Sequence, residues 1–195
     1  MLKRVFDIIS SLMVLLIIFP LLILISILIK LDSKGQIFYY QKRIGLNGKE
    51  FNLYKFRTMK PGSDKKGLLT VGNDSRITRV GSILRKLKLD EIPQLFNIIT
   101  GDMSVVGPRP ETPNYVELYN EEQRKVLNIK PGLTDYASLE FINENELLAK
   151  HDNPEKVYIE TIMPQKLRLN LKYIQDQNFL LDLKIIFRTI FKILN

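Results

Sequence analysis

Lys88-Leu89-Asp90-Glu91-Ile92-Pro93-Gln94-Leu95-Phe96-Asn97 is the stretch around which the rest of the chain is organised. Its two adjacent carboxylates, Asp90 and Glu91, stand just before a proline and an apolar run that ends at Gly101. Proline is tolerated in the first turn of a helix and glycine is a common C-terminal stop, so the pattern predicts a helix here. The carboxylates then lie at the helix N-terminus, where free N–H groups and the helix dipole favour anions.

Cations surround this pair of carboxylates. They are Arg79, Arg85, Lys86 and Lys88 before it, and Arg109 within Gly107-Pro108-Arg109-Pro110 after it. Carboxylates in a cationic setting indicate either a structural ion-pair network or a phosphate site with a carboxylate nucleophile or metal ligand. The prolines stiffen the backbone beside Arg109, which suits bidentate phosphate recognition and a structural salt bridge equally. Spacing alone leaves both interpretations open.

Composition limits the chemistry available to the chain. Its 195 residues suffice for one domain with an appendage, and they include no cysteine and a single histidine, His151, in a polar stretch. These counts exclude disulfides, thiolate metal sites, and triads or metal sites built on several histidines. A metal would rest on oxygen ligands, which favours an ion such as Mg²⁺. The net charge of +8 fits nucleic acid, an anionic membrane surface or phosphorylated substrates.

An apolar segment near the N-terminus predicts membrane association. Residues 8–29 carry no charge and are nearly all aliphatic or aromatic, over a length that matches a helix crossing the hydrocarbon layer. Pro20 falls in the middle and is expected to kink the helix. Positive charge stands on both flanks, so orientation cannot be read from it. A straight span and a bent helix that returns to the same leaflet both stay open, and a buried core helix is the soluble alternative.

A hairpin and a polar loop are expected next. Residues 36–42 and 50–58 are rich in aromatic and β-branched side chains, with the turn signal Asn47-Gly48 between them. Alternation along the second strand places Lys55 and Arg57 on one face, which fits a solvated face or a phosphate contact. The loop over 60–74 contains glycines that match neither a P-loop nor a dinucleotide fingerprint.

Helices are predicted over most of the remainder. A basic helix is expected over 79–89, Thr112-Pro113 opens another to about Leu127, and Asn153-Pro154 opens a third.

The last predicted helix, over 179–194, has an unusual pattern. Lys184, Arg188 and Lys192 recur every four residues among apolar side chains, a narrow basic stripe beside a broad apolar face. This pattern is typical of a helix lying among lipid headgroups, and a core helix of the soluble domain is the alternative. Together with the N-terminal segment it moves the balance from nucleic acid, for which no reading helix or aromatic platform is present, toward the membrane.

These motifs, taken in order, resemble the bacterial sugar transferases, which are monotopic polyprenyl-phosphate phosphoglycosyl transferases. The resemblance covers nearly the full length. It is carried by Lys3-Arg4-Val5-Phe6-Asp7, Tyr54-Lys55-Phe56-Arg57-Thr58-Met59, Leu89 to Asn97, Gly101-Asp102-Met103-Ser104-Val105-Val106-Gly107-Pro108-Arg109-Pro110-Glu111 and Pro131-Gly132-Leu133-Thr134.

The resemblance implies an enzyme that moves a sugar-1-phosphate from a UDP-sugar to a membrane polyprenyl phosphate and releases UMP. It implies a re-entrant N-terminal helix on the bacterial inner membrane and a catalytic domain that faces the cytoplasm. Asp90 would be the nucleophile that forms a covalent phosphosugar intermediate, and Glu91 its partner in proton transfer or metal positioning. Mg²⁺ would bind near Asp90. Lys55, Arg57, Arg85 and Arg109 would contact substrate anions.

Three departures from the family pattern are visible. Phe19-Pro20 stands where many members have Ser-Pro, residues 135–146 replace a Gly-Trp-Ala-Gln-Val-Asn-Gly segment, and Asn170 replaces an aspartate. The identity of the sugar therefore does not carry over. Polyprenol length, pathway and oligomeric state are equally undetermined.

The sequence thus predicts an α+β, mostly helical protein. Residues 1–31 would form the proline-broken, re-entrant membrane helix, and residues 32–195 the catalytic domain with a small β-hairpin and a C-terminal interfacial helix. The rival to a transferase is a non-catalytic membrane-anchored adaptor whose basic face binds anionic lipid or a partner enzyme.

Overall fold

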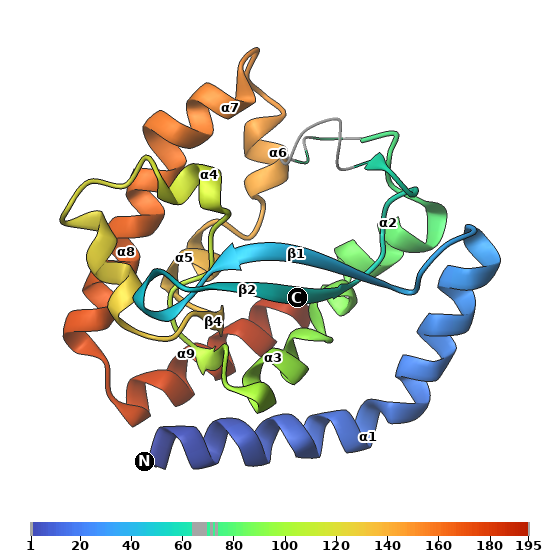
Figure 1. The fold of residues 1–195 in the computed structure, drawn as a ribbon, viewed down its shortest axis with the longest axis horizontal. Coiled ribbons are helices and arrows are strands. Elements are labelled where there is room, and N and C mark those ends of the chain that lie inside the picture. Colours follow the sequence, from blue (N-terminus) through green and yellow to red (C-terminus); the bar gives the residue numbers. More distant parts are fainter. Residues whose placement is uncertain (1, 64–69, 71, 73, 195) are drawn as a thin grey trace.

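The computed structural model describes residues 2–63, 70, 72 and 74–194. The chain is mostly helical, as expected, with helices packed around a small antiparallel hairpin (Figure 1). Its helices are α1 (Leu2–Asp32), α2 (Arg79–Lys86), α3 (Gln94–Thr100), α4 (Pro113–Val116), α5 (Tyr136–Glu140), α6 (Glu144–Leu148), α7 (Pro154–Val157), α8 (Met163–Asp176) and α9 (Phe179–Leu194). Its strands are β1 (Phe38–Ile44), β2 (Glu50–Phe56), β3 (Ser104–Val106) and β4 (Gly132–Thr134). Tight 3-10 turns cover Leu46–Gly48, Leu89–Glu91 and Gln123–Asn128, and a π turn covers Tyr158–Ile162.

The apolar helix α1 lies along the outside of the domain. It is one helix with Pro20 inside it, and its ribbon runs beneath the domain before turning upward beside α2 (Figure 1). Most of its aliphatic side chains are exposed, and Ser11, Leu15, Ile25 and Ile29 form the narrow buried stripe. Helix α1 is long and apolar enough to enter a membrane. Because most of its apolar surface is exposed, it is not the buried core helix of the soluble alternative.

The N-terminal turn of α1 is bonded to the domain. Arg4 donates hydrogen bonds to the carbonyl oxygens of Ile98 and Ile99, at 2.5 and 2.9 Å, and so satisfies the C-terminal end of α3. The carboxylate of Asp7 is buried and accepts from Ser104 Oγ at 2.8 Å and from the Val105 backbone N–H at 3.1 Å. Arg4 and Asp7 therefore attach the start of α1 to the domain, a role that the sequence reasoning did not assign to them.

The opposite end of α1 is bonded to the domain as well. The buried guanidinium of Arg57 donates to the carbonyl oxygens of Ser33 and Lys34 at 2.7 and 2.6 Å, which cap the end of α1. Asp32 accepts from the backbone N–H of Val80 at 3.0 Å and joins α1 to α2. Both ends of the apolar helix are thus fixed to one folded domain.

The predicted hairpin is present. β1 pairs antiparallel with β2 from Phe38 opposite Phe56 to Ile44 opposite Glu50. Asn47 and Gly48 take positive φ values of 56° and 74°, the left-handed conformation that such a turn needs. Most of the predicted 60–74 loop, residues 64–69, 71 and 73 with Gly67 among them, lies outside the described residues.

A second, parallel pairing was missed by the sequence reasoning. β3 pairs with β4, with Ser104 opposite Gly132 and Val106 opposite Thr134. The two backbones approach so closely that a Cβ on Gly132 would meet the backbone nitrogen of Gly107 at 2.1 Å. Strands of three residues carry too little alternation to be recognised, and only the glycines mark the crossing.

Two helix boundaries differ from the prediction. The helix expected from Pro113 to about Leu127 ends at Val116, and a separate 3-10 turn follows. Asn120 and Gln123 explain the break, since each side-chain oxygen accepts from the other residue's backbone N–H, at 2.9 and 3.0 Å. The basic helix α2 stops at Lys86, because Lys88 adopts the left-handed conformation at φ 56°.

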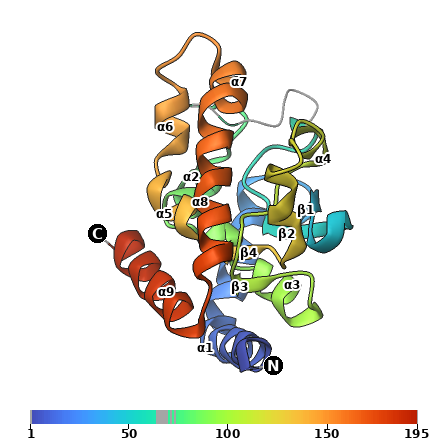
Figure 2. The ribbon, with the colours of Figure 1, turned by 90° about the vertical axis from the view of Figure 1, so that its left-hand side faces the viewer.

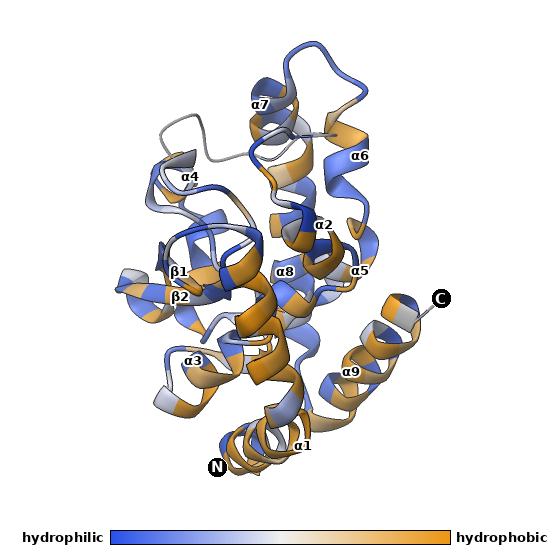
Figure 3. Cartoon of the chain, turned by 90° about the vertical axis from the view of Figure 1, so that its right-hand side faces the viewer, coloured by the Kyte–Doolittle hydropathy of each residue, from blue (hydrophilic) through white to orange (hydrophobic). Residues whose placement is uncertain are grey.

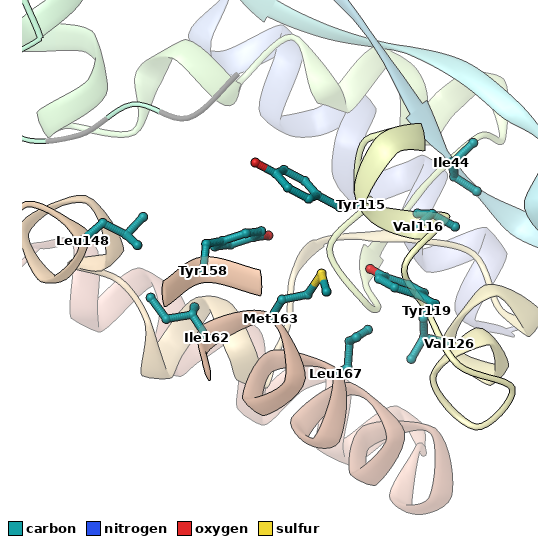
Figure 4. Close-up of a cluster of buried hydrophobic side chains, with 10 residues drawn as sticks. All are labelled: Ile44, Tyr115, Val116, Tyr119, Val126, Leu148, Tyr158, Ile162, Met163 and Leu167. Atoms are coloured by element: carbon teal, nitrogen blue, oxygen red, sulfur yellow. The ribbon is translucent and has the colours of Figure 1, made fainter. Parts of the chain in front are cut away.

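The largest core cluster joins the end of β1, α4 and α8. Tyr115, Tyr119, Tyr158, Met163 and Leu167 converge there (Figure 4). The rings of Tyr115 and Tyr158 lie 5.0 Å apart and bring α4 against the π turn before α8. This cluster positions the segment between Arg109 and α4.

Helix α9 packs by one side only. Ile185 and Asp182 are buried against β3 and α8, while Leu180, Phe187 and Phe191 are 70% or more exposed. In side view α9 slants across the same end of the molecule as α1, and both are largely hydrophobic (Figures 2 and 3). The exposed apolar face agrees with the predicted interfacial helix. The opposite face packs against the domain, as the core-helix alternative expected.

Candidate active site

The helix after the two central carboxylates begins later than predicted, so Asp90 and Glu91 lie in the turn before it. Asp90 and Glu91 belong to the 3-10 turn Leu89–Glu91, and Pro93 is the residue that caps α3. The left-handed Lys88 turns the chain sharply from α2 into this turn. Both carboxylates line a cavity of about 1150 Å³ together with Lys55, Arg85 and Arg109. The structure therefore gathers residues that lie more than fifty positions apart in sequence.

Glu91 is held by two cations. Arg109 donates to both of its carboxylate oxygens, one bond measuring 3.1 Å, and Lys55 Nζ donates to Oε1 at 3.1 Å. Burial acts to raise the pKa of Glu91, but the charges of Arg109 and Lys55 outweigh it and hold that pKa well below the usual value. Glu91 is therefore ionised at neutral pH, which favours positioning of cations over proton transfer.

Asp90 differs from its neighbour in its hydrogen bonding. Its side chain is buried in a residue only 7% exposed, yet within the described part of the chain no group donates a hydrogen bond to its carboxylate. Burial, then the charge of Glu91, raises the pKa of Asp90, while the charges of Lys55 and Arg85 act in the opposite direction. A buried carboxylate that has cations near it and no partner of its own is available for a ligand.

Lys55 and Arg85, two further predicted cations of the cavity, differ in their bonding. Burial lowers the pKa of Lys55, partly offset by the charge of Glu91. Arg85 donates to Thr58 Oγ1 at 2.8 Å and to Thr70 Oγ1 at 3.0 Å, and its charge lowers the pKa of Asp90. Both line the cavity that contains Asp90.

Arg57 is placed differently from the prediction. It lies just beyond the end of β2, and its guanidinium caps the carbonyls of Ser33 and Lys34. Strand alternation failed here because β2 ends at Phe56, so Lys55 and Arg57 do not share the face of a continuous strand. Arg57 supports α1 and also lines the cavity that contains Asp90, so its contact with substrate stays a prediction.

A buried network beside Arg109 was not assigned from the sequence. The carboxylate of Glu111 accepts from Arg43 Nη1 at 2.9 Å, from the Thr112 backbone N–H at 2.8 Å and from the hydroxyl of Tyr158. Arg43 also donates to the carbonyl of Pro110 at 3.1 Å. This network fixes the backbone on both sides of Arg109. In the sequence, the one sign of it was the carboxylate of Glu111, two residues after Arg109.

The divergent segment after β4 supports the same arginine. Asp135 is fully buried, accepts from the backbone N–H of Arg109 at 3.2 Å, and caps α5 by accepting from Ser138 N at 2.6 Å. Asn170 lines the cavity from α8, 4% exposed, and Oδ1 has no partner among the described residues. An amide at this position cannot neutralise an arginine as a carboxylate would.

The oxygen donors of the cavity fit a metal shared with a substrate. Among the described residues no three His, Cys, Asp or Glu side chains form a cluster. Mg²⁺ commonly takes only one or two protein carboxylates and completes its shell with substrate phosphates and water. Asp90, which lacks a partner, meets that requirement, whereas both oxygens of Glu91 are occupied by cations.

The predicted membrane residues lie at the end of the molecule where the apolar helices are exposed. Pro20 is exposed within α1, and Lys184 and Arg188 are exposed on α9. Lys192 donates to the carbonyl oxygen of Leu139 and so also ties α9 to the end of α5.

The whole chain, residues 1–195, matches the family model described as bacterial sugar transferase. It is 36% identical over 98% of its length to a UDP-glucose:undecaprenyl-phosphate glucose-1-phosphate transferase of Escherichia coli K12, of which the match covers 40%. It is 33% identical over 98% of its length to an N-acetylgalactosamine phosphotransferase acting on undecaprenyl phosphate from Aeromonas hydrophila, covering 43%. An exopolysaccharide production protein of Rhizobium leguminosarum is 40% identical over 97% of this chain and is covered to 93%. The chain thus spans about two fifths of the first two relatives and nearly all of the third.

Proposed function

The chain belongs to the bacterial sugar transferase family, and from this premise we propose that it transfers a sugar-1-phosphate from a UDP-sugar to a membrane polyprenyl phosphate. The observation that carries the proposal is the contrast between two adjacent carboxylates. Glu91 is clamped by Arg109 and Lys55, while Asp90 faces the same cavity without a hydrogen-bond partner among the described residues. Such a pair suits a reaction that needs one ionised nucleophile and a fixed set of cations.

The first step is attack by a carboxylate oxygen of Asp90 on the β-phosphorus of the UDP-sugar. A bond forms between this oxygen and phosphorus, the bond from that phosphorus to the bridging oxygen breaks, and UMP leaves with the electron pair. Repulsion between two anions is the obstacle, and Lys55, Arg85 and Arg109 offset it. When bound, Mg²⁺ would neutralise part of the diphosphate charge.

The second step returns Asp90 to its starting state. A phosphate oxygen of the polyprenyl phosphate attacks the same phosphorus, and the aspartyl oxygen leaves as a carboxylate. The product is a polyprenyl diphosphate sugar. No proton has to move in either step, which agrees with a Glu91 that stays ionised.

We further propose that α1 is re-entrant. A straight span would carry the N-terminus to the opposite side of the membrane, but Arg4 and Asp7 at one end and Asp32 at the other all bond to the same domain. Tags at the two ends of the chain should then be accessible from the cytoplasmic side alone. Accessibility of the N-terminal tag only from the other side would refute this topology.

The test of function is radiolabel transfer from a panel of UDP-sugars into organic-extractable lipid, with UMP measured in parallel. Wild type should label lipid and release UMP, and Asp90→Asn should do neither. Asp102→Asn is the matched control, because Asp102 is an exposed carboxylate outside the cavity. Equal labelling by wild type and Asp90→Asn would remove Asp90 from its role, and no labelling by wild type with any sugar would favour a non-catalytic adaptor.

A further inference from the structure

A separate apolar groove of about 470 Å³ lies between the second half of α1 and the hairpin. Ile23 and Ile27 of α1 line one side, and Phe96 of α3 lines the other. Of the described residues along it, Lys30 alone carries a charge. The groove is therefore suited to a hydrocarbon chain, with a cation near one end.

The groove adjoins the cavity that contains Asp90. Phe38 and Phe56 line both spaces, and their rings stack with centroids 5.4 Å apart, so the groove and the cavity meet at this pair. Pro93, three positions after Asp90, is a further wall of the groove. A molecule with an apolar chain and an anionic head could thus occupy both spaces at once.

We propose that the groove holds the isoprenoid chain of the acceptor while its phosphate extends past Phe38 and Phe56 to Asp90. This inference rests on the proposed function, which supplies a polyprenyl phosphate as acceptor. The groove is formed by the membrane helix itself, so the chain passes from the bilayer to the groove without crossing water.

The catalytic cavity has another edge near the membrane, between α1 and α9. Ser10 and Ser11 of α1 and Thr189 of α9 line that edge, beside Ile190. Hydroxyl groups make it a more polar path than the groove, where aliphatic and aromatic side chains predominate. The groove is therefore the better site for an extended hydrocarbon.

The chain contains no tryptophan, so one introduced tryptophan reports on its own surroundings. Ile27→Trp places the probe in the groove, and Leu24→Trp is the matched control on α1, because both residues are 52% exposed and Leu24 does not line the groove. Fluorescence is measured in nanodiscs with farnesyl phosphate carrying a nitroxide at the chain end. A nitroxide-labelled phosphatidylcholine calibrates general exposure to lipid. No UDP-sugar is added, so the readout does not depend on catalysis.

We expect the labelled farnesyl phosphate to quench Ile27→Trp at least twofold more than Leu24→Trp, and the labelled phosphatidylcholine to quench both equally. Phe96→Trp, on α3, repeats the test from the other wall should Ile27→Trp fold poorly. Equal quenching of the groove and control probes overturns the proposal, as does equally selective quenching by phosphatidylcholine. Stronger quenching of Ile190→Trp would assign the chain to the edge between α1 and α9. Absence of UMP release by wild type would instead refute the proposed function.

Discussion

Replacing Glu91 by glutamine tests whether this carboxylate organises the cations of the site. The substitution keeps the size of the side chain and removes its charge. The carboxylate accepts two hydrogen bonds from Arg109 and one from Lys55, and its side chain is 17% exposed. Glutamine offers one acceptor oxygen, and its NH₂ group points a donor at cations that are themselves donors.

The size of the effect follows from these contacts. A hydrogen bond to a charged group contributes about 1.5–3 kcal/mol, and glutamine weakens three of them. The side chain of Arg109 is 31% exposed, so solvent screens part of its interaction. Because the bonds are weakened and not all lost, we expect transition-state stabilisation to fall by about 3 kcal/mol in total. This corresponds to a fall on the order of 100-fold in kcat/KM for the UDP-sugar.

The pH profile gives an independent sign. Asp90 must be ionised to act, and burial and the charge of Glu91 raise its pKa, so activity should fall on the acid side at a higher pH than for an ordinary aspartate. In Glu91→Gln the repelling charge is gone and Lys55 and Arg109 are released to face Asp90. The pKa of Asp90 then falls, and the acid limb should move to lower pH.

The assay is UMP release against pH, with the acceptor lipid saturating. A value of kcat/KM within twofold of wild type, together with an unmoved acid limb, would refute the idea that Glu91 organises Arg109 and Lys55 for catalysis. An alkaline limb present in wild type and abolished in Glu91→Gln would instead identify Glu91 as a proton donor.

Three further substitutions test other parts of the site and its anchor. Arg109→Lys replaces a two-bond fork by a point charge, so kcat/KM for the UDP-sugar should fall about tenfold in steady-state kinetics; an unchanged value would mean that Arg109 serves the fold only. Arg57→Ala removes the cap at the end of α1 and should lower stability by about 2–4 kcal/mol, seen as a lower Tm in detergent. KM for the UDP-sugar is measured on the folded fraction, and a raised KM with a normal Tm would show that Arg57 serves as a substrate contact and not as a cap. Lys3→Met leaves the buried Asp182 with the hydroxyl of Tyr173 as its remaining partner, and should cost about 1 kcal/mol by the same thermal measurement, because Lys3 is partly exposed; an unchanged Tm would show that the pair contributes nothing.

The sequence predicted those elements in which local chemistry and structure agree. Asn47-Gly48 marked the hairpin turn, Asn153 capped α7 through its side chain, and the spacing of cations over 179–194 indicated α9. Each signal lies within a few residues of the structure that it specifies, so no tertiary information was needed.

Features that depend on distant partners were not predictable in the same way. The pairing of β3 with β4 is a contact between two three-residue strands, and nothing local announces it. The capping role of Arg57 requires knowing where α1 ends relative to β2. The family motifs nominated Asp90 as nucleophile and Glu91 as its partner, but the difference in their hydrogen bonding depends on Lys55 and Arg109, which only the folded chain brings to Glu91.

The bonds of the N-terminal turn impose an order on biosynthesis. Arg4 meets its partners 94 and 95 residues later in the chain, and Lys3 meets Asp182 only 179 residues later. During translation the apolar helix leaves the ribosome long before these partners exist, and the bond from Lys3 to Asp182 cannot form until the start of α9 has been synthesised. Long-range closure of this kind is slow compared with local helix formation. Nascent chains arrested before Asp182 should therefore hold Arg4 and Asp7 through residues 98–105 but leave Lys3 without its carboxylate partner, and the anchor would tighten as the last step of maturation.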